Sequence, residues 1–112
     1  MSHNQIYDPE KDLWTQGGEI PEERQQGGAG TVVYDGKIYM ACGNTLGHTS
    51  GTNNWFDEYD PATNTWKVLP EAPMNQGRHG SQAVVYKKKV YIAAGSPVRG
   101  GAKTQSIEIF SF

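Results

Sequence analysis

An internal repeat covers most of the chain and restricts its fold more than any other feature. A shift of 52 positions, which moves Tyr7 onto Tyr59, superimposes identical residues along the repeat. The first members of the pairs are Tyr7, Asp8, Pro9, Trp14, Pro21, Gly28, Val32, Val33, Tyr34, Lys37, Tyr39, Ala41 and Gly43. A repeat of this length is one supersecondary unit that buries its apolar face against its neighbours. We therefore divide the chain into units at residues 7–58 and 59–110, preceded by a tail at residues 1–6.

Two apolar runs predict the first two strands of each unit. The first run is β-branched and apolar enough to be buried on both faces. The runs cover residues 30–34 and 37–43 in the first unit, and residues 82–86 and 89–95 in the second. Asp35-Gly36 between the first two runs is a strong hairpin signal. The second unit has Lys87-Lys88 at this turn, which lacks glycine and is therefore the less favourable of the two.

The segment Tyr-Asp-Pro marks the turn between the third and fourth strands. Pro61 fixes its own φ and keeps Asp60 extended, so residues 55–59 and 66–69 are predicted to be two antiparallel strands joined by a tight turn. The polar stretch at residues 44–54 is predicted to be a long loop. Residues 106–110 predict one further third strand near the end of the chain.

The composition excludes several classes of function. The 112 residues carry a net charge of −2, without a basic stripe for nucleic acid, a polybasic membrane anchor or a long apolar run. A single cysteine, Cys42, allows neither an intramolecular disulfide nor a two-cysteine metal site within one chain. Residues 1–5 have no signal-peptide pattern, so the chain as it stands fits the cytoplasm, and no cofactor is expected.

Together the repeated motifs resemble the Kelch repeat, which forms one blade of a β-propeller. They are Val84-Val85-Tyr86, Val90-Tyr91-Ile92, Gly95, Tyr59-Asp60-Pro61, Trp66 and Arg78-His79-Gly80. The long loop looks most like bacterial Kelch proteins related to the propeller of galactose oxidase. Two departures from the pattern occur. The usual double glycine is Cys42-Gly43 in one unit and Ala94-Gly95 in the other, and Gln26-Gly27-Gly28 replaces Arg78-His79-Gly80 in the first unit.

The resemblance implies an all-β fold with blades of four antiparallel strands, two blades per chain. Kelch rings usually have six blades, so we expect three copies to close one ring as a homotrimer. The strand at Leu13 and Trp14 of one copy would then pair with Ile107 and Ile109 of its neighbour and complete that blade. Residues 110–112 and 7–9 would compete for one position, so residues 1–6 are expected to be displaced or poorly ordered.

The resemblance also suggests a binding site at the mouth of the channel. Arg78 matches the arginine of the Arg-x-Gly motif, with Arg24 or Gln26 nearby in the first unit. Three Arg78 side chains around one axis would hold a carboxylate, a sulfate or an acidic peptide. The alternative is that Arg78 caps backbone carbonyl groups between blades.

Other candidate binding residues border the channel or its rim. They are His79, Asn44, Ser96 and His48, the last on the long loop. Trp14 and Trp66 occupy the repeat's structural tryptophan position, which leaves Trp55 and Phe56 as the aromatic residues open to ligand. The resemblance to galactose oxidase suggests a copper site, for which Tyr39, His48, His79 and Cys42 supply the residue types. Their spacing in the sequence does not support such a site.

Three functions follow from these residues. The first is a non-catalytic, self-assembling propeller that acts as a scaffold or binding module. The second is an enzyme of the sialic acid mutarotase type, which would need an acid or base beside Arg78, whereas Glu22, Glu23 and Glu71 lie in predicted turns that face solvent. The third is an engineered or truncated propeller without a ligand.

Overall fold

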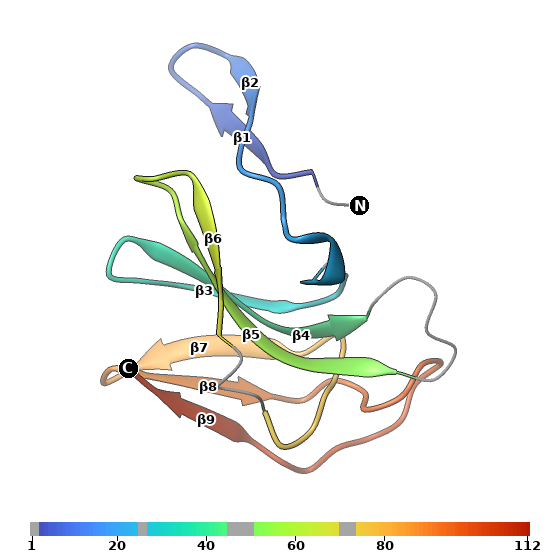
Figure 1. The fold of residues 1–112 in the computed structure, drawn as a ribbon. Coiled ribbons are helices and arrows are strands. Elements are labelled where there is room, and N and C mark those ends of the chain that lie inside the picture. The colour runs from blue at the N-terminus through green and yellow to red at the C-terminus, as the bar shows by residue number, and fades with distance from the viewer. Residues whose placement is uncertain (1–2, 25–26, 45–50, 70–73) are drawn as a thin grey trace.

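Residues 3–24, 27–44, 51–69 and 74–112 are described by a computed structural model, which has three antiparallel sheets (Figure 1). The first sheet is a hairpin of β1 (Gln5–Asp8) and β2 (Leu13–Gln16). The second contains β3 (Gly30–Tyr34), β4 (Lys37–Asn44), β5 (Thr52–Asp60) and β6 (Thr65–Val68) in that order. The third contains β7 (Gln82–Tyr86), β8 (Lys89–Ala93) and β9 (Glu108–Ser111). The all-β prediction is confirmed.

A single 3-10 turn, η1 (Glu22–Arg24), interrupts the strands of the described part of the chain. It was not anticipated from the sequence. In the described ranges no helix has the length and apolar character needed to cross a membrane.

The four-stranded sheet follows the repeat pattern closely. Asp35 and Gly36 form the first turn with φ angles of 48° and 73°, as an Asp-Gly hairpin requires. The ladder between β4 and β5 shifts register between Ala41 and Gly43, and Cys42 at this bulge has a φ of 62°. After the bulge, Gly43 and Asn44 pair with Asn53 and Thr52. For this reason β5 begins at Thr52, inside the stretch predicted to be a loop.

The three-stranded sheet repeats this arrangement with one change of spacing. Phe110 lies opposite Val90 in the third sheet, as Tyr59 lies opposite Ile38 in the second. Phe110 therefore takes the place of Tyr59, and Glu108 takes the place of Asp57. The constant shift of 52 positions would have aligned Asp57 with Ile109 instead.

The N-terminal hairpin has the form of the outer half of a blade. Tyr7 lies opposite Trp14, as Tyr59 lies opposite Trp66. The hydroxyl of Tyr7 donates to Asp12 Oδ1 at 2.7 Å, and the hydroxyl of Tyr59 donates to Asn64 Oδ1 at 2.7 Å. The repeat therefore extends to the hydrogen bond that braces the turn.

In the single chain, β1 and β2 pair with each other. Gln5 and Ile6 belong to β1, and Trp14 lies opposite Tyr7 of the same chain. A short turn brings β1 to the edge of β2 at a small loop-closure cost, which explains this local pairing. The hairpin stands on the side of the four-stranded sheet away from β7, β8 and β9 (Figure 1).

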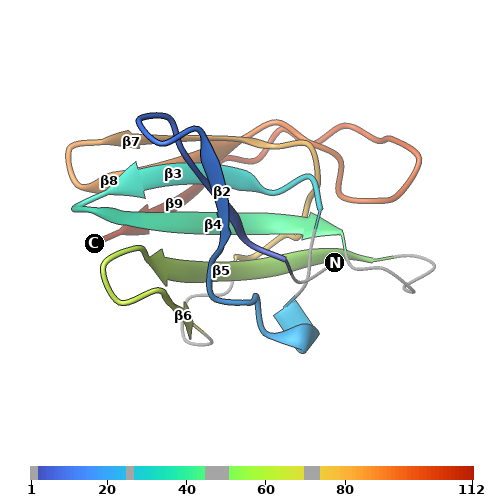
Figure 2. The ribbon, with the colours of Figure 1, turned by 90° about the horizontal axis from the view of Figure 1, so that it is seen from above.

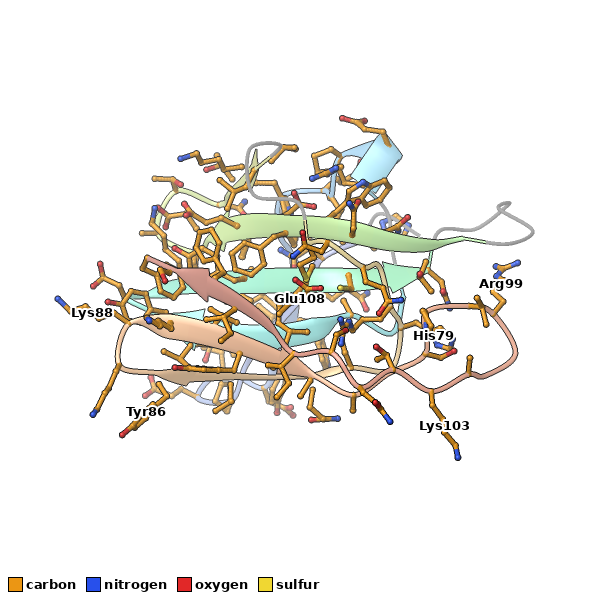
Figure 3. All side chains as sticks on the ribbon, turned by 90° about the horizontal axis from the view of Figure 1, so that it is seen from below. His79, Tyr86, Lys88, Arg99, Lys103 and Glu108 are labelled. Carbon is orange, nitrogen blue, oxygen red and sulfur yellow. The ribbon has the colours of Figure 1, made fainter. Side chains whose placement is uncertain are left out.

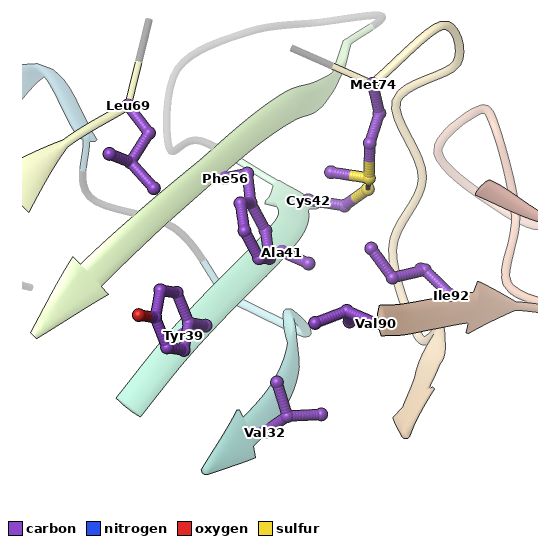
Figure 4. Packing of buried hydrophobic residues seen from close by; sticks show 9 residues of the cluster. All are labelled: Val32, Tyr39, Ala41, Cys42, Phe56, Leu69, Met74, Val90 and Ile92. Carbon is purple, nitrogen blue, oxygen red and sulfur yellow. Dashed lines mark hydrogen bonds between the residues drawn. The ribbon is translucent and has the colours of Figure 1, made fainter. Parts of the chain in front are cut away.

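The hydrophobic core lies between the second and third sheets (Figure 4). Its members are Val32, Tyr39, Ala41, Cys42, Phe56, Leu69, Met74, Val90 and Ile92. Figure 4 shows the sulfur atoms of Cys42 and Met74 facing each other, at a separation of 3.2 Å. Near the chain end, Phe112 stacks on Tyr34 with the ring centroids 4.1 Å apart. The core is thus a joint between two sheets and draws on strands from both repeats.

The inner strands differ from expectation in their burial. The sequence predicts that β3 and β7 are buried on both faces, but Val32 is 8% exposed while Val33 is 68% exposed. Seen from above, β3 lies beside β7 (Figure 2). One face of β3 is covered by the third sheet, and no part of the described chain covers the other to the same extent. The second sheet therefore keeps this face open to solvent at β3, whereas Asp57 and Tyr59 on the same face are buried.

Candidate functional site at the rim

Arg78 precedes β7 in the chain, lies against the third sheet and is fully buried, with an exposed fraction of 0%. Its Nη1 atom donates to the carbonyl oxygen of Ser106 at 2.9 Å, and its Nη2 atom donates to Ser106 Oγ at 2.7 Å. Nη1 also donates to the carbonyl oxygen of Ala94 at 3.3 Å, and Glu108 Oε1 accepts from Nη2 at 3.4 Å. These groups direct the guanidinium into its own blade, where it caps the carbonyl oxygens of Ala94 and Ser106.

Arg24 makes the matching contact in the four-stranded sheet. Its Nη2 atom donates to Asp57 Oδ1 at 2.6 Å, and its Nε atom donates to Oδ2 at 3.1 Å. The guanidinium carbon lies 4.5 Å from the centroid of the Trp55 ring. Trp55 therefore holds Arg24 by a cation–π contact. Trp55, which the sequence left open to ligand, thus has a role within the blade, and Phe56, left open in the same way, lies in the hydrophobic core.

Asp57 and Glu108 were not predicted from the sequence. Both are buried carboxylates on the third strand of their sheet, and each accepts hydrogen bonds from an arginine, which is partly buried in the case of Arg24 and fully buried in the case of Arg78. Removal of either partner would leave a buried charge unpaired, which is costly. An acidic residue in an apolar strand could have indicated each of these carboxylates. The second repeat is one residue shorter, however, so the shift of 52 positions did not align Asp57 with Glu108.

Two matching backbone bridges, one in each repeat, involve the residues predicted for the rim. Asn44 belongs to the first bridge, and His79 and Ser96 form the second. Gly27 pairs with Asn44, and His79 pairs with Ser96. The amide nitrogen of Gly80 donates to the carbonyl oxygen of Gly28 at 2.8 Å, and this bond joins the two repeats. Gln26 and His48 lie outside the described residues.

Ser96 orders the loop that follows β8. Its Oγ atom donates to the carbonyl oxygen of Val98 at 2.6 Å and accepts from the amide nitrogen of Ala102 at 2.7 Å. His79 Nε2 lies 3.1 Å from the same carbonyl oxygen, so a ring proton on that nitrogen would donate to it. Arg99 and Lys103 extend from this loop (Figure 3). We call residues 96–104 the rim loop. Side-chain hydrogen bonds hold this loop in place without regular secondary structure.

Reactive groups in the core are held in their neutral forms. Burial raises the pKa of the Cys42 thiol to about 11, so the thiol stays protonated near neutral pH. Burial, followed by the hydrogen bond to Glu58, raises the pKa of Tyr39 to about 12. Within the described ranges no three His, Cys, Asp or Glu residues are grouped so that they could hold a metal ion.

The sheets and their repeated braces define a segment of a β-propeller, and comparison with known proteins identifies the family. The chain is 33% identical over 111 residues to the Kelch-like protein terF of Aspergillus terreus, covering 96% of this chain and 23% of that protein. It is 31% identical over 91 residues to an F-box/kelch-repeat protein of Arabidopsis thaliana, covering 80% of this chain and 25% of that protein. The chain therefore consists of two repeats of the Kelch family.

The solved structures agree on the fold. The structure of YjhT superimposes with a TM-score of 0.67 at 23% identity, covering 83% of this chain and 27% of that one. No protein-family model matches the chain. The chain thus spans about a quarter of the length of the curated relatives it matches, whose shares are 23% and 25%.

Proposed function

We propose that the chain is a non-catalytic binding scaffold whose two-blade units assemble into a six-bladed ring of three copies. In this ring, β2 of one copy lies beside β9 of the next and completes its three-stranded sheet. The assembly gives the rim loops a common closed platform. Binding takes place at these loops.

One observation carries the assembly proposal. The β1–β2 hairpin has the register and the tyrosine brace of the outer hairpin β5–β6, while the third sheet has β9 at its outer edge. An unpaired strand edge is a template for another strand. By analogy with Tyr59 and Trp66, Trp14 of one copy would lie opposite Phe110 of the next. This register shifts the pairing predicted from the sequence, which placed Ile107 and Ile109 opposite β2.

The buried ion pairs support β9, and not β1, as the third strand of that blade. β9 carries Glu108, which bonds to Arg78, whereas the register of β1 places Gln5 at the corresponding position. A neutral glutamine would leave the buried Arg78 without a counter-charge. β1 is then a local competitor for the edge of β2 and is released on assembly.

The experiment that tests the assembly is solution mass by light scattering after size exclusion, across a dilution series. The 112-residue chain is expected to give a species of three chains. Deletion of residues 1–16, which removes β1 and β2, should abolish it, while deletion of residues 1–8, which removes only the competitor, should preserve or strengthen it. Trp14→Ala provides a point variant with the same expected direction as the longer deletion. A folded monomer of the intact chain at all concentrations, or a trimer unchanged by loss of β2, would overturn the proposal.

For the ligand, we propose an anionic group such as a carboxylate or acidic peptide. Arg78 is enclosed, so the support comes from the rim loop, where Arg99 and Lys103 bring positive charge beside His79. Titration calorimetry with an oligo-glutamate peptide should give binding that weakens with salt and with Lys103→Gln. Lys67→Gln, on the exposed outer strand β6, is the matched control. No heat at low salt would remove the ligand proposal and leave the assembly proposal intact.

The geometry favours this scaffold over a sugar-converting enzyme. An acid or base would have to reach a substrate beside Arg78, and Glu108 is the carboxylate found there. It is 8% exposed and accepts a second hydrogen bond, from Asn75 Nδ2 at 3.0 Å. Its oxygens are thus engaged within the blade. Conversion of a sugar anomer by the purified protein would reverse this ranking.

A further inference from the structure

We infer that the chain binds a water molecule in its interior, where the segment before β7 packs against the end of β4. Three buried polar atoms at this place, Arg78 Nε, Ser81 Oγ and Asn44 Oδ1, have no hydrogen-bond partner within the part of the chain that the structure describes. Most buried polar groups in proteins are hydrogen-bonded, either to protein or to an ordered water. We call these three residues and the space between them the polar corner.

Two residues of the polar corner are almost completely buried. Arg78 is 0% and Ser81 is 5% exposed. The two terminal nitrogens of Arg78 donate to Ala94, Ser106 and Glu108, but none of these bonds uses the hydrogen on Nε. The donors of a guanidinium point in fixed directions, so Nε cannot share these partners and needs one of its own.

The second repeat brings Arg78 and Ser81 together beside the end of β8. Nη1 of Arg78 donates to the carbonyl oxygen of Ala94 at 3.3 Å. Gly95 is the next residue, and a Cβ atom on it would lie 3.2 Å from the Cβ atom of Ser81. Both side chains therefore lie against residues 94–95, at the end of the joint that is nearest the rim loop.

The first repeat forms the opposite wall of the polar corner. Ser81 Oγ lies 3.2 Å from the position that a Cβ atom would take on Gly30, which pairs with β4. The amide nitrogen of Gly43 donates to the carbonyl oxygen of Arg78 at 2.8 Å, and Asn44 follows Gly43 at the end of the same strand. The residues that carry the three atoms thus meet at the end of β4. Cys42, the residue before Gly43, lies in the joint between the two sheets (Figure 4).

The types of atom select water as the occupant. Arg78 Nε is a donor, Asn44 Oδ1 is an acceptor, and the Ser81 hydroxyl can act as either. A water molecule can accept from the first, donate to the second and bond to the third, which gives it the about three hydrogen bonds usual for a buried water. An anion would be repelled by Asn44 Oδ1 and by the nearby Glu108, and a metal ion would be repelled by Arg78.

The polar corner belongs to the joint inside the chain. The repeat places Ala29 at the position that matches Ser81, so the first repeat lacks the hydroxyl. The bound water completes the hydrogen bonding of Arg78 and connects it to Asn44 of the other repeat. This connection lies within one chain and does not depend on the assembly of copies.

The two arginines that contact the sheets provide a test with an internal control. In the intact chain labelled with ¹⁵N, the Nε–H signal of Arg78 is expected to show cross-peaks with water of opposite sign in nuclear Overhauser and rotating-frame spectra. Opposite signs indicate a bound water, whereas proton exchange gives equal signs. Arg24 Nε donates to Asp57 Oδ2 at 3.1 Å, so its signal should show no bound water. Equal effects at both arginines, or none at Arg78, would overturn the inference.

A substitution tests the part played by Ser81. Ser81→Ala removes one partner of the water, and Ala29 at the matching position shows that the repeat accommodates alanine there. The cross-peak at Arg78 should weaken by roughly threefold or more, because a water with fewer hydrogen bonds exchanges faster. Ser111→Ala, at an exposed serine of β9, is the matched control and should leave the cross-peak unchanged. A cross-peak that survives Ser81→Ala at full strength would remove Ser81 from the site.

A crystal structure of the chain grown from a bromide salt separates water from an anion. We expect density for a water within hydrogen-bond distance of Arg78 Nε and Ser81 Oγ, without anomalous signal. An anomalous bromide peak at this place, or an Nε atom bonded directly to a protein group, would overturn the inference. The outcome is independent of the proposed assembly: a monomer that holds the water would overturn the ring and support the polar corner, and a three-chain ring without the water would do the reverse.

Discussion

The second and third sheets are built from the same repeat, and they differ mainly in what covers them. Their first two strands have identical registers, with Val33 opposite Ile38 in one and Val85 opposite Val90 in the other. Burial nevertheless differs greatly at matching positions, as with Val32 at 8% and Val84 at 58% exposure. Local sequence therefore determines the strands, and the neighbouring sheet determines which of their faces becomes a core.

The arginine–carboxylate pairs of the two sheets also show a shared arrangement built from different residues. In the second sheet Arg24 lies against Asp57 and Trp55, and in the third Arg78 lies against Glu108 and Ser106. The two arginines stand at different positions of the repeat, and their carboxylate and third partner are different residues. In both sheets, however, one arginine lies over the third strand. The repeat preserves the interaction and allows its residues to change.

The largest expected effect tests the difference in burial directly. Phe56→Ala should lower the free energy of unfolding by about 3–5 kcal/mol, because it removes a buried ring and leaves a cavity. Ile107→Ala, at the matching exposed position, should cost less than about 0.5 kcal/mol in dilute protein. Both values come from denaturant unfolding at a concentration below association. Equal losses would show that the two positions are buried alike and would remove the contrast between the sheets.

The ion pair of the third sheet provides the next prediction. Arg78→Met is expected to cost about 3–5 kcal/mol, since it leaves Glu108 as an unpaired buried charge. The double variant with Glu108→Leu should recover part of that loss, because the unpaired charge is then gone. Urea unfolding of the two single variants and the double variant forms a thermodynamic cycle. Additive losses would mean that the two side chains do not act as a pair.

Strand positions follow from short-range patterns and were predicted well. β3 and β7 have the predicted bounds, since the β-branched runs begin and end at clear turns. The early start of β5 at Thr52 was missed because the polar residues there pair through backbone after the Cys42 bulge. The Kelch repeat could be predicted because its motifs are local and occur twice, and the comparison with known proteins confirmed it.

The candidate site was harder to predict, for a physical reason. The partners of Arg78, Ser106 and Glu108, lie 28 and 30 residues away along the chain, and only the fold brings them together. The sequence could therefore propose that Arg78 is important, but not that its guanidinium turns into its own sheet. Exposure of Val84 was equally unpredictable, because it depends on the neighbouring sheet.

A third prediction concerns stability in acid, where the second sheet has an ionisable carboxylate, Glu58, at a position that is apolar in the third sheet. Burial acts to raise the pKa of Glu58, but hydrogen bonds from Lys37 and Tyr39 outweigh it and hold the pKa below its usual value. A depressed carboxyl pKa stabilises the fold above the unfolded pKa of about 4.3, and this contribution is lost as pH falls through the folded pKa.

Glu58→Gln should therefore destabilise the protein at pH 7, by less than the two substitutions above, and have a smaller effect below pH 4. Ile109 takes the place of Glu58 in the third sheet, opposite Tyr91, so Ile109→Gln is the matched control without this pH dependence. Unfolding free energies measured between pH 7 and pH 3 check the difference. A gap between wild type and Glu58→Gln that stays constant with pH would contradict the role of the carboxylate.

The smallest expected effect concerns the two turns between the inner strands. Gly36 has a φ of 73° in the second sheet, whereas Lys88 takes a φ of 60° in the third, in the left-handed region that penalises a side chain. Lys88→Gly should stabilise the protein by up to about 1 kcal/mol, because the relieved strain exceeds the added entropy of the unfolded glycine. Gly36→Lys should have the opposite effect through backbone strain alone, because a Cβ at this position would meet no atom within 4 Å. Melting temperatures of the two variants should therefore move in opposite directions. A shift of the same sign in both would mean that something other than backbone strain distinguishes the two turns.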